Sequence, residues 1–182
     1  MFPLGSVLFP HTPLLVRIFE PRYLTMLGRL LDEEDPRFGV VLIERGREVG
    51  GDRFEVAEWL DDDPHPRARV DAVPELEWDD ALTALRGEAE AIVRRVVARA
   101  SGAESGGLEI VRWDADTPLS DDPVEAAWQL AALAPLGEFD RYSLLQSTTM
   151  GGLLRMIIDL TLDIEPVITA GTADGGGYSP AG

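Results

Sequence analysis

The chain of 182 residues is long enough for one domain with a hydrophobic core or for two small subdomains, and its net charge is −17. It has no cysteine and all 16 basic residues are arginine, which excludes disulfides, cysteine zinc sites, Schiff bases, the phosphate-loop lysine and the serine–lysine dyad. Because nucleic acid and anionic membranes bind clustered positive charge, the acidic composition also argues against both as partners.

Up to about Glu75 the sequence predicts short strands and a single helix. Apolar or alternating runs, several of them bounded by proline or glycine, predict five strands at residues 2–9, 13–19, 37–44, 53–60 and 66–73. Residues 45–52 are rich in glycine and are interpreted as a turn.

One helix is predicted from Glu20 to Asp32, between the second and third strands. Pro21 suits the first helical position, and Glu20 places negative charge at the positive end of the helix dipole. Glu20, Pro21 and Arg22 are interpreted as the structural joint between strand and helix, with Arg22 pairing with an acid such as Glu20. Phe19 and Tyr23 are expected to hold the strand against the helix.

From Trp78 onward the apolar residues recur with the period of a helix. A helix of roughly twenty residues is predicted first. A second begins with Asp122 as its cap and Pro123 at its first position, a third covers residues 138–146, and a fourth stops before Pro166. The sequence therefore predicts an α+β fold with a β-rich subdomain (1–75), a helical subdomain (76–168) and a disordered tail (169–182).

Candidate catalytic and metal-binding patterns are weak. Asp114, Asp116 and Glu125 occupy three places of a calcium loop, but Pro118 and Leu119 stand where a ligand and a glycine are needed, so no metal site is predicted. No serine lies in a G-x-S-x-G motif, and His65 stands between two prolines, as in an exposed turn. We expect no cofactor and no enzymatic activity; a hydrolase would need His11 near a serine and an acid.

The order of "FPLG", "LFP", "IFEPRY", "FGVVL" and a glycine turn resembles the N-terminal substrate-binding domain of Lon proteases, particularly its stand-alone bacterial relatives. Residues 119–146 also resemble the helical half of that family. The resemblance implies a PUA-like β-rich pseudo-barrel followed by a helical subdomain similar to a four-helix bundle. It implies binding without catalysis, because ATP hydrolysis and proteolysis belong to other domains of Lon proteases.

The chain departs from the family pattern after its glycine turn. In relatives, strands separate this turn from a segment such as residues 53–60, whereas here Gly51 is followed at once by Asp52. A segment of a few tens of residues is expected to be missing between these two positions, either as a true deletion or as a gap in the chain. Without those strands, an otherwise closed sheet would have an open edge.

Three functions are compatible with the sequence. The preferred one is a non-catalytic module of the cytoplasm that binds unfolded or extended polypeptides or a partner protein, in an oligomeric state that the sequence does not indicate. The alternatives are a sensor that binds a small molecule in the β-rich part, and the hydrolase above. No apolar stretch is long enough to span a membrane, and no signal-peptide pattern begins the chain.

The predicted contact surface comprises Phe9, His11, Tyr23, Met26 and Trp59. The loop "FPHTP" brings Phe9 and His11 between two prolines. As an alternative to the structural joint, a functional interpretation makes the following helix one wall of a groove, with Tyr23 and Met26 partly exposed. Trp59 precedes an acidic turn. These residues are aromatic or soft, as contact residues often are. Because the surround is acidic, basic-apolar peptides are expected to bind faster than acidic ones, and salt is expected to reduce that difference.

Overall fold

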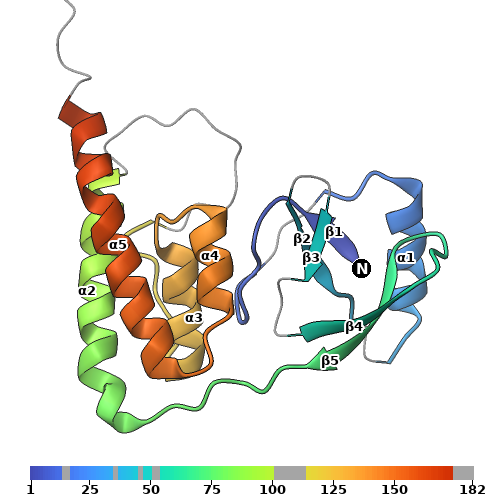
Figure 1. Ribbon diagram of the computed structural model, residues 1–182, viewed down its shortest axis with the longest axis horizontal. Coiled ribbons are helices and arrows are strands. Elements are labelled where there is room, and N and C mark those ends of the chain that lie inside the picture. The colour runs from blue at the N-terminus through green and yellow to red at the C-terminus, as the bar shows by residue number, and fades with distance from the viewer. Residues whose placement is uncertain (14–16, 35–36, 45–46, 51–53, 101–113, 174–182) are drawn as a thin grey trace, which may run out of the picture. The chain divides into compact units, whose positions relative to one another are not determined.

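The computed structural model describes residues 1–13, 17–34, 37–44, 47–50, 54–100 and 114–173 (Figure 1). The chain divides into two compact units, Met1–Glu75 and Leu76–Gly182. All described strands lie in the first unit together with one helix, and the second unit is helical. The predicted α+β class is thereby confirmed. The segment expected to be missing between Gly51 and Asp52 lies outside the described residues.

The first unit contains a three-stranded sheet in the order β1-β2-β3. β1 (Phe2–Leu4) runs parallel to β2 (Val40–Glu44), and β2 is antiparallel to β3 (Arg47–Gly50). Parallel neighbours need a long crossover, and α1 (Pro21–Leu31) lies in that connection. The sheet therefore brings the start of the chain beside the residues that follow α1.

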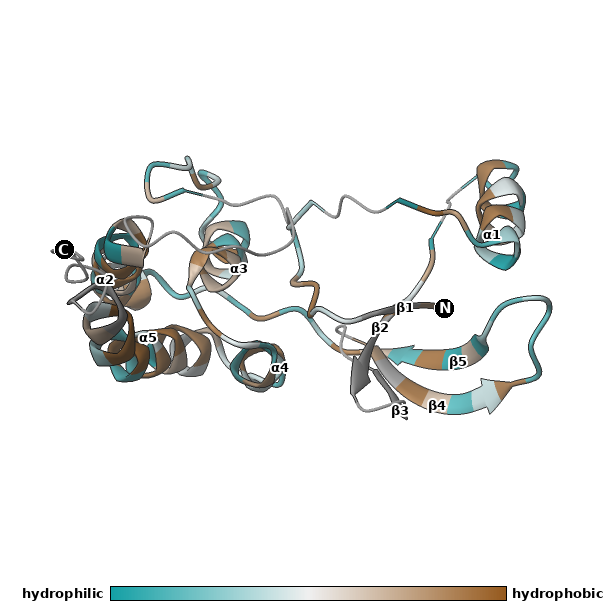
Figure 2. Cartoon of the chain, turned by 90° about the horizontal axis from the view of Figure 1, so that it is seen from above, coloured by the Kyte–Doolittle hydropathy of each residue, from teal (hydrophilic) through white to brown (hydrophobic). Residues whose placement is uncertain are grey.

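β4 (Phe54–Leu60) and β5 (Arg67–Ala72) form a separate antiparallel hairpin, with an irregularity in the register between Val56 and Glu58. Apolar and polar residues alternate along β5, which shows as bands of brown and teal (Figure 2), whereas the alternation in β4 is interrupted at its irregularity. Such alternation is typical of a sheet with one face covered and the other in water. These two strands were predicted with nearly the observed bounds.

The strand predictions near the N-terminus were wrong in extent. Only Phe2–Leu4 of residues 2–9 forms a strand, and residues 17–19 form none, while 14–16 lie outside the described residues. Val7 and Phe9 are nevertheless buried. An apolar run in the sequence indicates that its residues are buried. A strand also needs a neighbouring strand to pair with, and the run itself does not show one, which explains the error. β3 was missed because its glycine-rich surroundings resemble a turn.

The joint before α1 is built from local polar contacts. Glu20 is the extended N-cap residue, and Pro21 occupies the first turn, where its missing N–H leaves no acceptor unsatisfied. Arg22 Nε donates to Glu20 Oε2 at 2.9 Å, and its guanidinium lies 4.6 Å from the Tyr23 ring centre. Phe19 is 81% exposed, so the expectation that it packs the joint was wrong.

The buried face of α1 forms the core of the first unit with β1. Tyr23, Met26 and Leu30 recur at helical spacing and pack with Phe2, whose ring meets that of Tyr23 edge to face at 4.8 Å. The predicted partial exposure of Tyr23 and Met26 was therefore wrong. The neighbouring stripe of Leu24 and Leu31 is the one that faces solvent.

The second unit contains four α-helices in its described part, α2 (Thr83–Ala100), α3 (Pro123–Leu133), α4 (Glu138–Leu145) and α5 (Met150–Ala173). A 3-10 turn, η1 (Asp80–Leu82), precedes α2, so the first helix starts later than the predicted Trp78. α2 and α5 run side by side (Figure 1). The fully buried side chains of this core include Trp128, Leu130, Leu153, Leu154 and Ile157.

The ends of α3 are satisfied by side chains. Asp122 Oδ1 accepts hydrogen bonds from the backbone N–H groups of Val124 and Glu125, as a capping residue does. At the other end, Arg141 of α4 donates to the carbonyls of Ala132, Ala134 and Leu136. Burial lowers the pKa of Arg141, yet arginine stays charged and can hold these carbonyls.

The carboxylates of the calcium-like pattern are used within their own loop. Glu125 Oε2 accepts from the Ser120 hydroxyl at 2.8 Å, and Asp114 Oδ1 accepts from the Asp116 N–H at 2.9 Å. Among the described residues, no group of three or more His, Asp or Glu side chains is placed to hold a metal ion.

α5 continues through Pro166 to Ala173, which corrects the predicted end of this helix and part of the predicted disordered tail. Proline inside a helix removes one hydrogen bond, at a cost of about 3 kcal/mol. The Thr169 hydroxyl donates to the Glu165 carbonyl at 2.9 Å just beyond the proline. Glu165 itself contacts Arg95 and Arg99 of α2, and these contacts hold this part of α5 in place. The rest of the predicted tail, residues 174–182, lies outside the described residues.

Replacing Thr161 by valine is expected to stabilise the second unit by about 1 kcal/mol. Thr161 is fully buried on α5, and its hydroxyl has no hydrogen-bond partner within the described part of the chain. A buried hydroxyl without a partner carries a desolvation penalty of about 1–3 kcal/mol, and valine has nearly the same shape. Urea unfolding followed by circular dichroism measures the change. Thr169→Val on the same helix, at an exposed hydroxyl with a partner, is the control and should not stabilise; equal effects would contradict the explanation.

Replacing Glu165 by glutamine is expected to lower the melting temperature at pH 7 but not in acid. The hydrogen bond from Arg95 is the main cause that lowers the pKa of Glu165, and the charges of Arg95 and Arg99 add to it. Because the pKa is lower in the folded state, the contribution to stability is present above the unfolded value of about 4.3. It is lost as the pH falls through the folded pKa. Melts at several pH values test this; a difference that persists in strong acid would contradict it.

Candidate functional site

A pocket of about 560 Å³ lies in the first unit between α1 and the β4–β5 hairpin, and we call it the α1–hairpin pocket. Its apolar wall is formed by side chains from α1, β2, β4 and β5: Met26, Leu30, Val40, Val56, Leu60 and Val70. Phe38 and Phe54 line it as well and remain about two-fifths exposed. The volume is in the range of about 300–1,000 Å³ that is usual for ligand sites.

The spacing of apolar residues explains why these side chains converge. Met26 and Leu30 are four residues apart and share one face of α1. Phe54 and Val56 alternate along β4, and Val70 stands opposite Val56 in the hairpin register. Directly paired residues of antiparallel strands point to the same face, so the hairpin presents an apolar surface to the helix.

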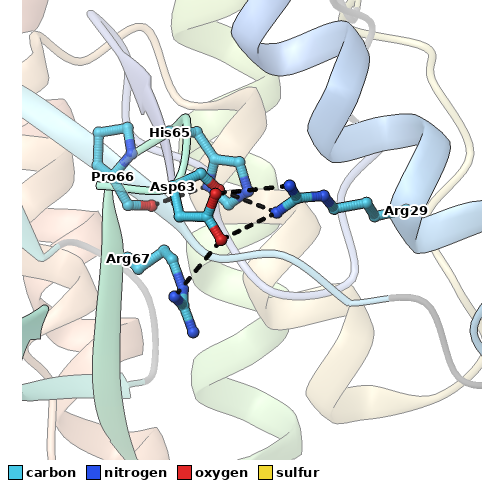
Figure 3. A network of polar contacts seen from close by, with 5 residues as sticks. All are labelled: Arg29, Asp63, His65, Pro66 and Arg67. Carbon is cyan, nitrogen blue, oxygen red and sulfur yellow. Dashed lines mark hydrogen bonds and ion pairs between the residues drawn. The ribbon is translucent and has the colours of Figure 1, made fainter. Parts of the chain in front are cut away.

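The rim of the pocket is charged and ties the helix to the hairpin. Arg29, in the last turn of α1, donates through Nη1 to the Asp63 carbonyl at 3.0 Å and to Asp63 Oδ2 at 3.4 Å, and through Nη2 to Oδ1 at 3.5 Å (Figure 3). The Asp63 N–H donates to the His65 carbonyl at 3.2 Å. These contacts close the loop between β4 and β5 and hold it against α1.

The same loop contacts the start of the chain. The Met1 nitrogen donates to the Pro66 carbonyl at 2.7 Å. His65 Nδ1 lies 3.1 Å from the same oxygen (Figure 3). Arg67 Nη1 lies 4.0 Å from Asp63 Oδ2. His65 is thus part of the turn at the pocket rim and is partly buried, whereas the sequence had suggested only an exposed turn.

The predicted contact residues do not form one cluster. Phe9 and Tyr23 are buried, and Tyr23 belongs to the core with Phe2. His11 lies in a left-handed turn (φ 56°), and its Nε2 is 2.7 Å from Glu75 Oε1. Left-handed backbone is uncommon for residues other than glycine, although histidine adopts it more often than most. None of these three residues lines the pocket.

Met26 and Trp59 are the predicted contact residues that relate to the pocket. Met26 lines its wall. Trp59 is 43% exposed and stands in register opposite Ala68, which is a lining residue. Sequence reasoning missed Phe38, Phe54 and Val70; the alternation in residues 53–60 and 66–73 was the signal that could have indicated a shared face.

An apolar pocket with a charged rim, set between a helix and a hairpin of a mixed α+β fold, is typical of a ligand-binding domain. Residues 1–50 match the family model of the substrate-binding domain of the ATP-dependent protease La (LON). This segment supplies α1 and the helix side of the pocket. The resemblance of the first part of the chain to Lon substrate-binding domains is thereby confirmed.

The fold of most of the chain is similar to that of a solved Lon N-terminal domain protein from Xanthomonas campestris. The sequences are 23% identical, the TM-score is 0.51, and the match covers 87% of this chain and 95% of the other. None of the curated proteins compared with the chain matches it. Both matches are to a substrate-binding or N-terminal domain and neither is to a catalytic one. Within the described residues, no helix is long and apolar enough to cross a bilayer.

Proposed function

We propose that the chain is a non-catalytic module that binds apolar segments of unfolded or extended polypeptides, or of a partner protein, in the α1–hairpin pocket. The observation that carries the proposal is the match of residues 1–50 to a substrate-binding domain, because these residues supply Met26, Leu30 and Val40 of the pocket wall. The remaining wall comes from the hairpin, outside the matched segment. A single large apolar side chain of the ligand would enter the pocket and bury its surface there.

The proposal includes the finer fold expected from the resemblance. In it, the five strands of the first unit belong to a PUA-like pseudo-barrel, and the helices of the second unit form a subdomain similar to a four-helix bundle. The domain limits are those expected from the sequence, 1–75 and 76–168. The parallel pairing of β1 with β2 and the separate hairpin are compatible with an incomplete barrel.

The contact residues we propose are centred on the pocket. Phe38, Phe54 and Met26 line it, and Trp59 extends the apolar surface along β4. Phe54 and Trp59 are exposed, which makes them suitable anchors for a ligand. An anchor must be accessible in the free protein and buried in the complex. Phe9, His11 and Tyr23 are left out of this set because two are buried and His11 is bound to Glu75.

Replacing Phe54 by alanine is expected to weaken the binding of an unfolded protein by about 1–3 kcal/mol, which is roughly fivefold to more than a hundredfold in Kd. The ring lines the pocket and is 37% exposed, so its removal takes away contact area without opening the core. Reduced and carboxymethylated α-lactalbumin, which stays unfolded in buffer, is a suitable probe. Its affinity is measured by isothermal calorimetry or fluorescence anisotropy.

Phe19→Ala is the matched control for this experiment. Phe19 is an exposed phenylalanine of the same unit, and it is not among the residues that line the pocket. Its replacement should leave both the affinity and the melting temperature unchanged. If Phe19→Ala weakens binding and Phe54→Ala does not, the binding surface lies elsewhere; if the wild-type chain binds no unfolded protein, the proposed function is wrong.

Binding of a small molecule is the second candidate. The volume of about 560 Å³ would suit such a ligand, and this observation alone favours it. Under this alternative the unfolded protein would not bind, whereas a screen of metabolites by thermal shift would raise the melting temperature of the wild-type chain. The same ligand should have a smaller effect on the Phe54→Ala variant.

A further inference from the structure

The described residues that line the α1–hairpin pocket are less acidic in composition than the chain as a whole. The chain as a whole has 16 basic and 33 acidic residues. Among the described residues that line the pocket, three arginines (Arg29, Arg37 and Arg67) stand against two carboxylates (Glu33 and Asp63). The lining of the pocket is therefore richer in arginine, relative to carboxylates, than the strongly acidic chain.

Asp63 accepts hydrogen bonds from Arg29, whereas Arg67 lies farther from the same carboxylate. Both carboxylate oxygens of Asp63 accept from Arg29, at 3.4 and 3.5 Å, and Arg29 also bonds the Asp63 carbonyl. Arg67 Nη1 is 4.0 Å from Asp63 Oδ2, which is beyond hydrogen-bonding distance. Half of the Arg67 side chain is exposed, and its guanidinium forms no hydrogen bond within the described part of the chain.

Arg67 stands beside the apolar wall. It pairs in register with Leu60 of β4, and Ala68 and Val70 follow it on β5; all three line the pocket. A ligand that places an apolar side chain against Val70 and Leu60 brings its neighbouring residues close to this guanidinium. A guanidinium can bind a carboxylate through two parallel hydrogen bonds, which are stronger and more directional than neutral ones.

We propose that the α1–hairpin pocket selects polypeptide segments in which an acidic side chain flanks the apolar anchor, and that Arg67 binds this carboxylate. The inference rests on the proposed function and names the class of segment that the pocket prefers. It reverses the expectation of basic peptides, which followed from net charge alone. Net charge acts at long range on the encounter rate, whereas a short-range ion pair acts mainly on dissociation.

The test uses the full chain and short synthetic peptides with the apolar core Leu-Phe-Leu, flanked by glutamate, glutamine or lysine, acetylated and amidated at their ends. Fluorescence anisotropy gives each Kd. We expect the glutamate peptide to bind about threefold to tenfold more tightly than the glutamine peptide, and the lysine peptide to bind most weakly. Stopped-flow kinetics should show the preference in a slower dissociation.

Arg67→Gln and Arg69→Gln form a matched pair of variants. Both arginines are exposed on β5 and both changes remove one positive charge, but Arg69 bonds Glu58 at 2.7 Å and is not among the described residues that line the pocket. Arg67→Gln should abolish the preference for glutamate over glutamine, and Arg69→Gln should preserve it. Melting temperatures of both variants check that the fold is retained.

The outcomes separate this inference from the proposed function. If all three peptides bind equally, if the lysine peptide binds most tightly, or if the preference survives Arg67→Gln, the inference is wrong while polypeptide binding stands. If a glutamine peptide with a free C-terminus binds as tightly as the amidated glutamate peptide, the terminal carboxylate is the ligand and the acidic side chain is not. If the wild-type chain binds none of the peptides, both proposals are wrong.

Discussion

Replacing Trp128 by alanine is expected to lower the free energy of unfolding of the second unit by about 3–5 kcal/mol, which is a large part of the stability of a unit of this size. Trp128 lies in the middle of α3 and is fully buried. It is the largest of the fully buried side chains, so its removal leaves the largest cavity, and packed helices fill such a cavity only in part. Urea unfolding followed by far-ultraviolet circular dichroism measures the change without relying on tryptophan fluorescence.

Phe139→Ala is the control for Trp128→Ala. Phe139 is an aromatic residue on α4 of the same unit and is 76% exposed, so alanine there should change stability by no more than about 0.5 kcal/mol. A loss below about 1 kcal/mol for Trp128→Ala would mean that the core of the second unit is not packed as described.

Replacing Tyr23 by alanine is expected to cost about 3–5 kcal/mol of stability in the first unit. Its side chain is 2% exposed, its ring meets Phe2 at 4.8 Å, and it belongs to the same core as Met26 and Leu30. The contact-residue interpretation predicts the reverse, a loss of affinity with an unchanged melting temperature. Thermal unfolding and anisotropy binding on the same samples, at temperatures where each variant is folded, decide between these two roles.

Two further variants refine the test of Tyr23. Tyr23→Phe retains the ring against Phe2 and should keep most of the stability. Leu24→Ala changes the next residue of α1, whose side chain is half exposed, and should cost clearly less than Tyr23→Ala. If Tyr23→Ala melts like the wild type, α1 does not pack on β1 through this residue. The described position of α1 as a wall of the α1–hairpin pocket would then be wrong as well.

The core variants show how a loss of fold in the first unit changes the melting temperature, so a loss of ligand contact can be distinguished from it. Phe54→Ala, Phe19→Ala, Arg67→Gln and Arg69→Gln all change exposed side chains, and none removes a member of the core around Tyr23. A loss of affinity in these variants, at an unchanged melting temperature, therefore reports contact with the ligand.

The sequence by itself determined the elements whose signals are local. Pro21 and Asp122 stand at the starts of α1 and α3, because helix starts depend on neighbouring residues that satisfy or lack N–H groups. The period of the apolar residues separated the strand-rich first part from the helical second part, and an apolar run and an alternating run predicted β4 and β5. The order of short motifs indicated the Lon substrate-binding resemblance.

Only the tertiary structure decided which of these residues are accessible and which lie together. α1 has apolar residues on more than one face, and local spacing does not tell whether Tyr23 and Met26 or Leu24 and Leu31 are covered; the position of Phe2 decides it. α5 passes through Pro166 because contacts of Glu165 with Arg95 and Arg99 of a distant helix offset a local penalty. The contact of Arg29 with Asp63 likewise joins residues 34 positions apart and brings Arg67 to the same rim, which net charge cannot indicate.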